Sequence, residues 1–329
     1  TTAAAAATTT VATVDATATT NNASAVAVAA EKARYDAVGL AVGLTILVCA
    51  VLIVFTILIV LFARAHHCMD DDDDEEKSKT TVLVAATPAV VAVGGTAVTL
   101  TWTTSNADNV TIAAVPADST LPATFTLDGT ATALPAAGGT TTYTITASGP
   151  VGPDATANDT VLAIAPGDLV ITEIMFDPAG VADKMGEWFE VYNTTTHTIP
   201  LGSFSLRDGT ATHAVTGTPS LPAGDWFVFG INSNIATNGG AAVDYQYSTL
   251  AWANTGTLAP TLAFDGVTID TTSLVVPGAC VAGDAIVLNP SFTTAAGNDV
   301  AANWCIARAA DAYGSDGNHG TPGAVNACP

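Results

Sequence analysis

An uncharged run of 27 residues, from Ala37 to Ala63, limits where the rest of this chain can reside. A helix of that length rises about 1.5 Å per residue and reaches roughly 40 Å, which exceeds the roughly 30 Å hydrocarbon core of a bilayer. An acidic block from Asp70 to Glu76 follows the run within a few residues. The sequence therefore predicts a single transmembrane helix over 37–63, in contact with the lipid bilayer.

The predicted span divides the chain very unequally. We expect an Ala/Thr-rich N-terminal tail over 1–36 and an acidic spacer over 64–80, because a run of like charges stays solvated and extended. Gly39 and Gly43 stand four residues apart and predict a surface for close helix packing. No basic leader with a short apolar core precedes the run, so we interpret it as an uncleaved signal anchor.

The region after the span is strongly acidic. From Thr80 to Pro329 it holds 20 Asp and Glu residues against three basic ones, Lys184, Arg207 and Arg308, a net charge of −17. So few cations cannot neutralise phosphates, which argues against nucleic acid as a partner. The same charge favours protein partners and cations.

Five cysteines bear on where the chain resides. Cys49 lies in the apolar run and Cys68 follows it, whereas Cys280, Cys305 and Cys328 fall within the last 50 residues. No Cys/His spacing indicates zinc, so we expect a disulfide, with Cys305 and Cys328 as the preferred pair. Because disulfides persist outside the cytoplasm, we expect a bacterial inner-membrane protein with a cytoplasmic N-terminus and periplasmic or extracellular C-terminal domains.

Short runs of alternating apolar and Thr residues fill 81–166, and turn residues separate them. The period of two predicts β-strands, one of them in the run ATFTLDG (123–129), packed as a sandwich. Two segments, AVTLTWTTSNADNVTI and GGTTTYTITASG, resemble bacterial immunoglobulin-like repeats, with Trp102 in the expected core-strand position and Tyr143 on a late strand. The resemblance implies an architecture and names no ligand.

Five segments follow one another in order within 167–329. They are DLVITEIMFDPAG, GEWFEVYNTTTHTIPLGSFSLRDG, SLPAGDWFVFG, GDAIVLNP, and NDVAANWCIARA with GNHGTPGAVN. Together they resemble a bacterial lamin-tail domain, which implies a second sandwich used for attachment and protein contact. The predicted fold class is mainly β, with two tandem immunoglobulin-like β-sandwiches on a single N-terminal transmembrane α-helix.

Strand signals in the second module do not depend on the resemblance. Trp188, Val191 and Tyr192 are predicted to share one face of a strand whose other face carries Glu187 and Glu190.

Two acidic pairs, Glu187 with Glu190 and Asp177 with Asp183, have the residue types of a general acid and base. A paired-carboxylate hydrolase also needs a substrate cleft and a raised pKa, and neither can be inferred from the sequence. We therefore expect no enzyme, no catalytic residue and no organic cofactor.

The loop DAYGSDGNHG collects hard oxygen donors. Asp311, Asp316 and Asn318 together predict a Ca²⁺ site, although their spacing is not that of an EF-hand. The three histidines of this half lie far apart along the chain, and we interpret them as turn or surface residues.

A span, a spacer and two sandwiches suit a non-catalytic, single-span accessory or scaffold subunit of a multi-subunit bacterial membrane complex. The sandwiches would contact the other membrane-protein subunits, and two domains can supply the roughly 1,000 Å² that a stable interface needs. A photosynthetic reaction centre with its antenna, or a respiratory assembly, is the first hypothesis. The run 37–63 has no histidine, so we expect no pigment ligand from this chain.

Two alternatives stay open. The chain could be a subunit of a surface filament or adhesin with its apolar helix in a fibre core, although 36 residues precede the run here. It could also be a cell-surface module that binds glycans or cations.

Overall fold

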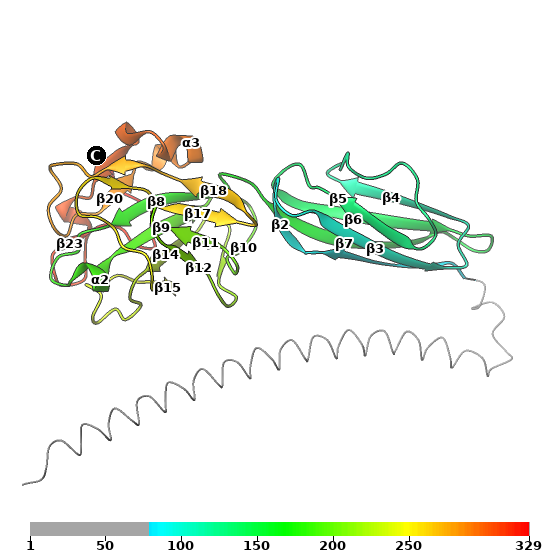
Figure 1. Cartoon of the computed structure of the whole chain (residues 1–329), viewed down its shortest axis with the longest axis horizontal. Helices are drawn as coiled ribbons and strands as arrows, with labels where there is room; N and C mark the ends of the chain where they lie inside the picture. Colours follow the sequence, from blue (N-terminus) through cyan, green and yellow to red (C-terminus); the bar gives the residue numbers. More distant parts are fainter. Residues whose placement is uncertain (1–78, 329) are drawn as a thin grey trace, which may run out of the picture. The chain divides into compact units, whose positions relative to one another are not determined.

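The computed structural model describes residues 79–328 of the chain (Figure 1). The predicted tail (1–36), the predicted span (37–63) with Gly39 and Gly43, and most of the predicted spacer lie outside these residues. Within 79–328, no helix has both the length and the apolar character needed to cross a membrane.

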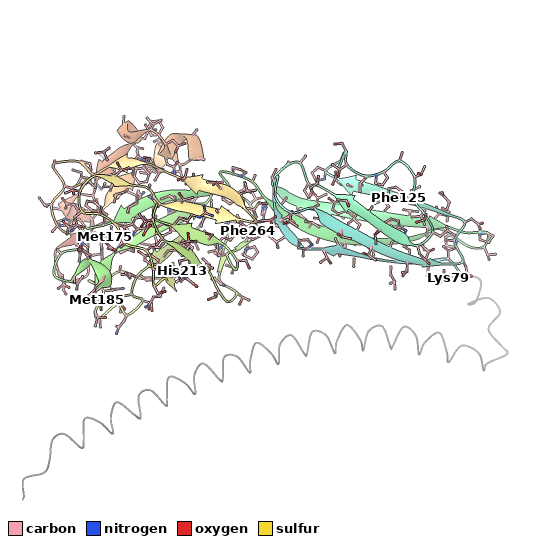
Figure 2. The ribbon with its side chains drawn as sticks, in the orientation of Figure 1. Lys79, Phe125, Met175, Met185, His213 and Phe264 are labelled. Carbon is pink, nitrogen blue, oxygen red and sulfur yellow. A yellow bond between two sulfur atoms is a disulfide. The ribbon has the colours of Figure 1, made fainter. Side chains whose placement is uncertain are left out.

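The first module contains strands β1 to β7, and Figure 2 labels Lys79, the first described residue before them. Their bounds are β1 (Thr81–Thr87), β2 (Val90–Ala92), β3 (Val98–Ser105), β4 (Asn109–Val115), β5 (Gly129–Ala133), β6 (Gly139–Ser148) and β7 (Ala155–Ile164). One sheet has the order β1-β3-β5 and the other β2-β7-β6-β4. Since β2 runs parallel to β7 whereas β1 pairs with β3, the chain changes sheets between β1 and β2. The result is an immunoglobulin-like sandwich.

Alternation places the core of this module between its two sheets. Trp102 on β3 is buried, as the sequence predicts, and Tyr143 on β6 is buried as well. Their polar atoms are satisfied, because the Trp102 Nε1–H donates to the Thr126 carbonyl (3.0 Å) and the Tyr143 hydroxyl donates to Asp118 (2.9 Å).

The prediction of a strand over 123–129 was wrong. That segment is a loop, and the strand next to it, β5, covers Gly129–Ala133. The alternating residues of the loop serve local packing instead, because Phe125 meets the Trp102 ring edge to face, with centroids 5.7 Å apart. Asp128 accepts a hydrogen bond from the Thr104 N–H, which holds the loop against β3.

The second module contains the remaining elements. Its strands are β8 (Leu169–Met175), β9 (Trp188–Asn193), β10 (Ile199–Pro200), β11 (Ser205–Arg207), β12 (Thr212–Ala214), β13 (Ser220–Leu221), β14 (Trp226–Gly230), β15 (Tyr245–Gln246), β16 (Thr257–Leu258), β17 (Thr261–Phe264), β18 (Val267–Thr271), β19 (Leu274–Val275), β20 (Ile286–Leu288), β21 (Trp304–Ile306), β22 (Ala312–Tyr313) and β23 (Asn318–His319). Its short helices are α2 (Asp183–Gly186), η1 (Pro290–Phe292), α3 (Ala295–Asn298), η2 (Ala301–Asn303) and η3 (Ala309–Asp311).

Two sheets form the body of the second module. The larger has the order β15-β14-β9-β8-β20-β21 and the smaller β12-β11-β17-β18, and the main apolar cluster contains residues of both. A second apolar cluster, which includes Met175 and Trp188, involves the opposite face of the larger sheet. The larger sheet is therefore covered on both faces over part of its area, which explains why β9 and β14 are apolar at most positions.

Hydrogen bonds join the two modules. The hairpin between β17 and β18 turns at Asp265, which has φ 52°, and Gly266, which has φ 78°. The Asp265 carboxylate accepts the backbone N–H of Thr96 (2.6 Å), the Thr96 hydroxyl and the N–H of Ala92 (3.3 Å). Ala92 and Ile164 of the first module also belong to the main apolar cluster of the second. The junction thus combines polar and apolar contacts.

Candidate functional site

A bulge in β8 organises the outer face of the larger sheet, the face opposite the main apolar cluster. The β8–β9 register moves from Ile171 opposite Val191 to Glu173 opposite Glu190, so Thr172 is an extra residue. A bulge turns two successive residues to one side of a sheet. Thr172 accordingly donates from its hydroxyl to the Glu190 carboxylate (2.7 Å) on the same face as Glu173.

Glu173 and Glu190 form a buried carboxyl pair, and neither side chain is exposed to solvent. Burial raises the pKa of Glu173 to about 8. Burial also raises the pKa of Glu190 well above its ordinary value, and repulsion from Glu173 adds to that increase. Both shifts favour the protonated form, and the pKa of about 8 for Glu173 means that the pair holds a proton at neutral pH.

The C-terminal segment Thr321–Asn326 lies across this carboxyl pair. The backbone N–H of Thr321 donates to Glu173 (2.9 Å), and that of Gly323 donates to Glu190 (2.7 Å). The side-chain amide of Asn326 donates to the carbonyl oxygens of Thr172 (2.7 Å) and Leu288 (3.1 Å). The two carboxyls and the amide therefore fasten the segment to the sheet.

Hydroxyl geometry supports a proton on Glu173. The Thr321 Oγ1 lies 2.8 Å from a Glu173 oxygen and 2.9 Å from the Asn326 side-chain oxygen. A hydroxyl has one proton and cannot donate to both acceptors. A proton on the Glu173 carboxyl resolves this conflict. The Glu173 carboxyl then donates to the Thr321 hydroxyl, and the Thr321 hydroxyl donates to the Asn326 side-chain oxygen.

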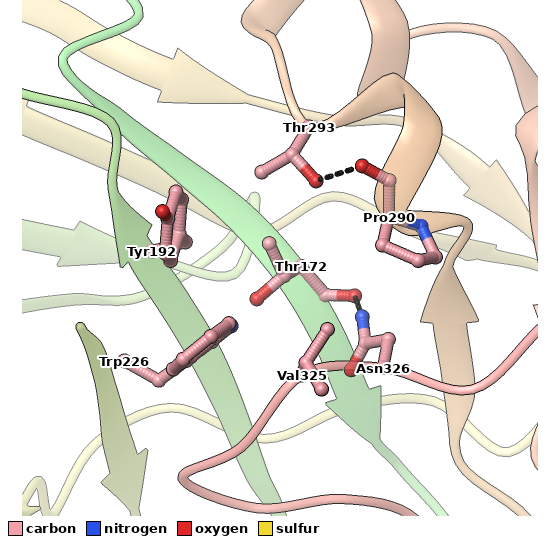
Figure 3. Close-up of a pocket in the computed structure, with 7 residues that line it drawn as sticks. All are labelled: Thr172, Tyr192, Trp226, Pro290, Thr293, Val325 and Asn326. Atoms are coloured by element: carbon pink, nitrogen blue, oxygen red, sulfur yellow. Dashed lines mark hydrogen bonds between the residues drawn. The ribbon is translucent and has the colours of Figure 1, made fainter. Parts of the chain in front are cut away.

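A pocket of about 220 Å³ opens beside the fastened segment (Figure 3). Its lining residues are Thr172, Tyr192, Trp226, Pro290, Thr293, Val325 and Asn326. The β9–β14 register sets Trp226 opposite Tyr192, with ring centroids 4.9 Å apart and planes inclined by 43°. Figure 3 shows these rings on one side of Thr172, with Val325 and Pro290 on the other. Sequence reasoning missed this pocket, and the available signal was the apolar character of both faces of WFEVY and WFVFG.

The predicted calcium ligands have other partners. Asp311 forms a salt bridge with Arg308 (2.9 Å), and Asp316 accepts from the Ser315 hydroxyl (3.1 Å). The buried amide of Asn318 accepts the Ala179 N–H and donates to the carbonyl oxygens of Ala179 and Gly239. Over the described part of the chain, no group of three or more His, Cys, Asp or Glu side chains is placed to hold a metal ion.

The structure brings Cys305 and Cys328 together as a disulfide, with Cα atoms 6.0 Å apart. Cys280 is half-buried and does not take part in it. Burial raises the pKa of the Cys280 thiol to about 11, and the Asp284 charge adds to this effect. That thiol therefore has little thiolate character at neutral pH.

The predicted face assignment on β9 was wrong. Val191 belongs to the main apolar cluster, whereas Trp188 belongs to the cluster on the opposite face, because side chains alternate along a strand. Glu187 accepts the N–H of Trp252 (3.1 Å) on the Val191 side, and Glu190 lies on the other. The two glutamates therefore cannot act together on one substrate.

The pair Asp177 and Asp183 is bridged by one side chain. The Asn254 amide donates to Asp177 (3.2 Å) and to Asp183 (3.3 Å). The pKa of Asp177 is raised first by burial and then by the Asp183 charge.

These sheets and clusters define the class of the described part of the chain, residues 79–328: it is mainly β, with two sandwich modules, the second closed by a fastened C-terminal segment. Within that class, residues 163–302 match the family model of the Lamin Tail Domain, so the second module is a lamin tail domain. No curated protein is significantly similar to the chain. A similar solved structure is a DUF4876 family protein from Bacteroides thetaiotaomicron, at 9% identity and a TM-score of 0.29, covering 64% of this chain and 86% of that one.

Proposed function

We propose that this protein is a non-catalytic, single-span accessory subunit of a multi-subunit bacterial membrane complex. In this proposal residues 37–63 form the membrane anchor, and the two β-sandwiches lie on the extracytoplasmic side. The sandwiches contact neighbouring subunits and hold them at fixed positions.

The junction between the modules is the observation that carries the proposal. Asp265 accepts hydrogen bonds from Thr96 and Ala92, and apolar residues of both modules pack in one cluster. A scaffold needs its contact surfaces at a defined separation, and a junction with its own polar and apolar contacts supplies that better than a bare linker. A hydrogen bond within a folded protein typically contributes about 1 kcal/mol to stability.

The placement of the acidic side chains supports a non-catalytic role. Glu173 and Glu190 bind backbone groups of the C-terminal segment, and Glu187 binds the backbone of Trp252. Raised pKa values also arise in structural carboxyl networks, and here their cause is burial within the sheet.

Native membranes provide the test. After solubilisation in a mild detergent and separation by size, the chain should migrate with a complex much larger than its own 32.9 kDa. Asp265→Asn should lower the fraction retained in the complex, whereas Asp299→Asn, at an exposed carboxylate away from the junction, should leave it unchanged. A solitary monomer would refute the proposal, and recovery in sheared fibres would favour the filament alternative.

A further inference from the structure

We propose that the pocket between Tyr192 and Val325 binds one ring of a neutral carbohydrate. This site goes beyond the proposed function and does not depend on it. Three properties of the pocket favour such a ligand: its shape, its hydrogen-bonding groups and its charge.

The shape of the pocket suits a single ring. Its volume of about 220 Å³ lies below the roughly 300 Å³ at which pockets for drug-sized ligands begin. Tyr192 and Trp226 form one wall through their ring surfaces, and Val325 and Pro290 stand across from them (Figure 3). An aromatic surface attracts the polarised C–H groups on the face of a sugar ring.

Two aromatic polar atoms remain available to a ligand. Among residues 79–328, neither the Tyr192 hydroxyl nor the Trp226 Nε1–H has an intramolecular hydrogen-bond partner. The other polar side chains of the lining are already engaged: Thr172 donates to Glu190, Thr293 donates to the Pro290 carbonyl (3.1 Å), and Asn326 binds the backbone. Both free donors belong to the ring pair that forms one wall of the pocket, and donors of this kind match the hydroxyl and ring oxygens at the edge of a sugar.

The charge of the lining indicates a neutral ligand. None of the seven lining residues carries a charged side chain. Glu190, which accepts from the lining residue Thr172, and its neighbour Glu173 lie buried beneath the C-terminal segment and favour their protonated forms. A quaternary ammonium ligand would be attracted to the aromatic rings. Its ammonium group has no acceptor, however, for the Trp226 N–H and the Tyr192 O–H.

A proline-rich peptide fits this face less well. Such peptides bind along a series of aromatic-lined grooves that each take part of an extended helix. Here a single pocket is closed on one side by Val325 and Pro290. The wall itself is preformed, because Glu190 and Asn326 hold the segment that carries Val325.

Tryptophan fluorescence gives a direct assay. Trp102, Trp188 and Trp252 are buried, so of the five tryptophans only Trp226 and Trp304 are partly accessible. The full chain, in a detergent without a sugar headgroup, is titrated with maltohexaose, cellohexaose, xylohexaose and chitohexaose. At least one should produce a saturable emission shift, and Trp226→Phe should abolish that shift while calorimetry still detects binding.

Three variants separate binding from folding. Tyr192→Phe keeps the ring and removes only the hydroxyl, and should weaken binding severalfold. Trp226→Ala should weaken it about tenfold or more, since each tenfold corresponds to about 1.4 kcal/mol. Ile235→Ala, at an exposed apolar residue outside the pocket, is the matched control and should bind as the wild type does.

Several results would overturn the proposal. One is the absence of a saturable response to all four oligosaccharides at millimolar concentration. Another is binding that both Tyr192→Phe and Trp226→Ala leave unchanged. Competing probes are choline chloride and an octaproline peptide, and saturable binding of either one in place of the oligosaccharides would assign the pocket to a different ligand class.

Discussion

Raising the pH should loosen the C-terminal segment that Glu173 and Glu190 fasten. Both carboxyls are fully buried and hydrogen-bonded to the segment, and both have raised pKa values because of that burial. Deprotonation would place two negative charges in a site that excludes water. We therefore expect the segment to open in alkaline solution before the rest of the sandwich unfolds.

The expected magnitude follows from Glu173. Its pKa moves from 4.5 to about 8, and each unit corresponds to about 1.4 kcal/mol, which gives about 5 kcal/mol as an upper limit. The folded state binds the proton more tightly than the unfolded state, so stability falls as pH rises. The contribution is fully present below about pH 4.5 and is lost progressively up to about pH 8. Glu190 acts in the same direction.

Hydrogen–deuterium exchange at the segment is the appropriate assay. The Thr321 and Gly323 amides donate to the two carboxyls. A peptide covering 320–326 therefore reports directly on whether the C-terminal segment is bound to the carboxyl pair. After correction for the intrinsic effect of pH on exchange, its protection should fall between pH 5 and pH 8. Glu190→Gln removes one of the two titrating carboxyls and should reduce this dependence, whereas Asp154→Asn, at an exposed carboxylate of the first module, should not.

Two outcomes would refute this reasoning. One is protection of 320–326 that stays constant between pH 5 and pH 8 in the wild-type chain. The other is a Glu190→Gln variant that retains the full pH dependence, because the carboxyl pair would then not be its source.

Three further predictions concern stability. Asp265→Asn should separate the melting of the two modules into two calorimetric transitions, because it weakens the acceptor for Thr96, and a single unchanged transition would contradict this. Replacing Cys305 and Cys328 together by Ser should cost about 3 kcal/mol in denaturant unfolding, from the entropy of a loop with a sequence separation of 23, and the wild-type chain under reducing conditions should match the variant. Trp102→Ala should destabilise the first module by about 3–5 kcal/mol, because it removes a large buried side chain; a loss below about 1 kcal/mol would show that the site collapses around the gap.

Sequence reasoning succeeded where large side chains alternate. Trp102 and Tyr143 stand out on strands with a clear period of two, and both lie in the core. It failed for β5, whose buried residues Ala131 and Ala133 are too small to distinguish a strand from a loop. Phe125 gave the neighbouring loop the stronger apolar signal, although the ring packs there without any strand pairing.

The candidate site was harder to predict from the sequence than the strands were. The glutamate pair exists only because Thr172 is bulged, which brings Glu173 opposite Glu190. The three-residue step from Ile171 to Ile174, both in the main apolar cluster, is the trace of that bulge in the sequence. The aromatic pair depends in addition on β9 pairing with β14, and such pairing between distant strands is not encoded in local periodicity.

The scarcity of cations explains how the modules use their carboxylates. Among residues 79–328, the salt bridge of Arg308 with Asp311 is the only one that involves a Lys or Arg side chain. Other carboxylates accept backbone N–H groups instead: Asp208 binds Ala211 (2.6 Å) and Ala251 (2.9 Å). Burial opposes ionisation of Asp208, but these hydrogen bonds leave its pKa below the ordinary value. Because such loop carboxylates stay anionic while serving the fold, a protein that docks on these modules should present a basic surface to them.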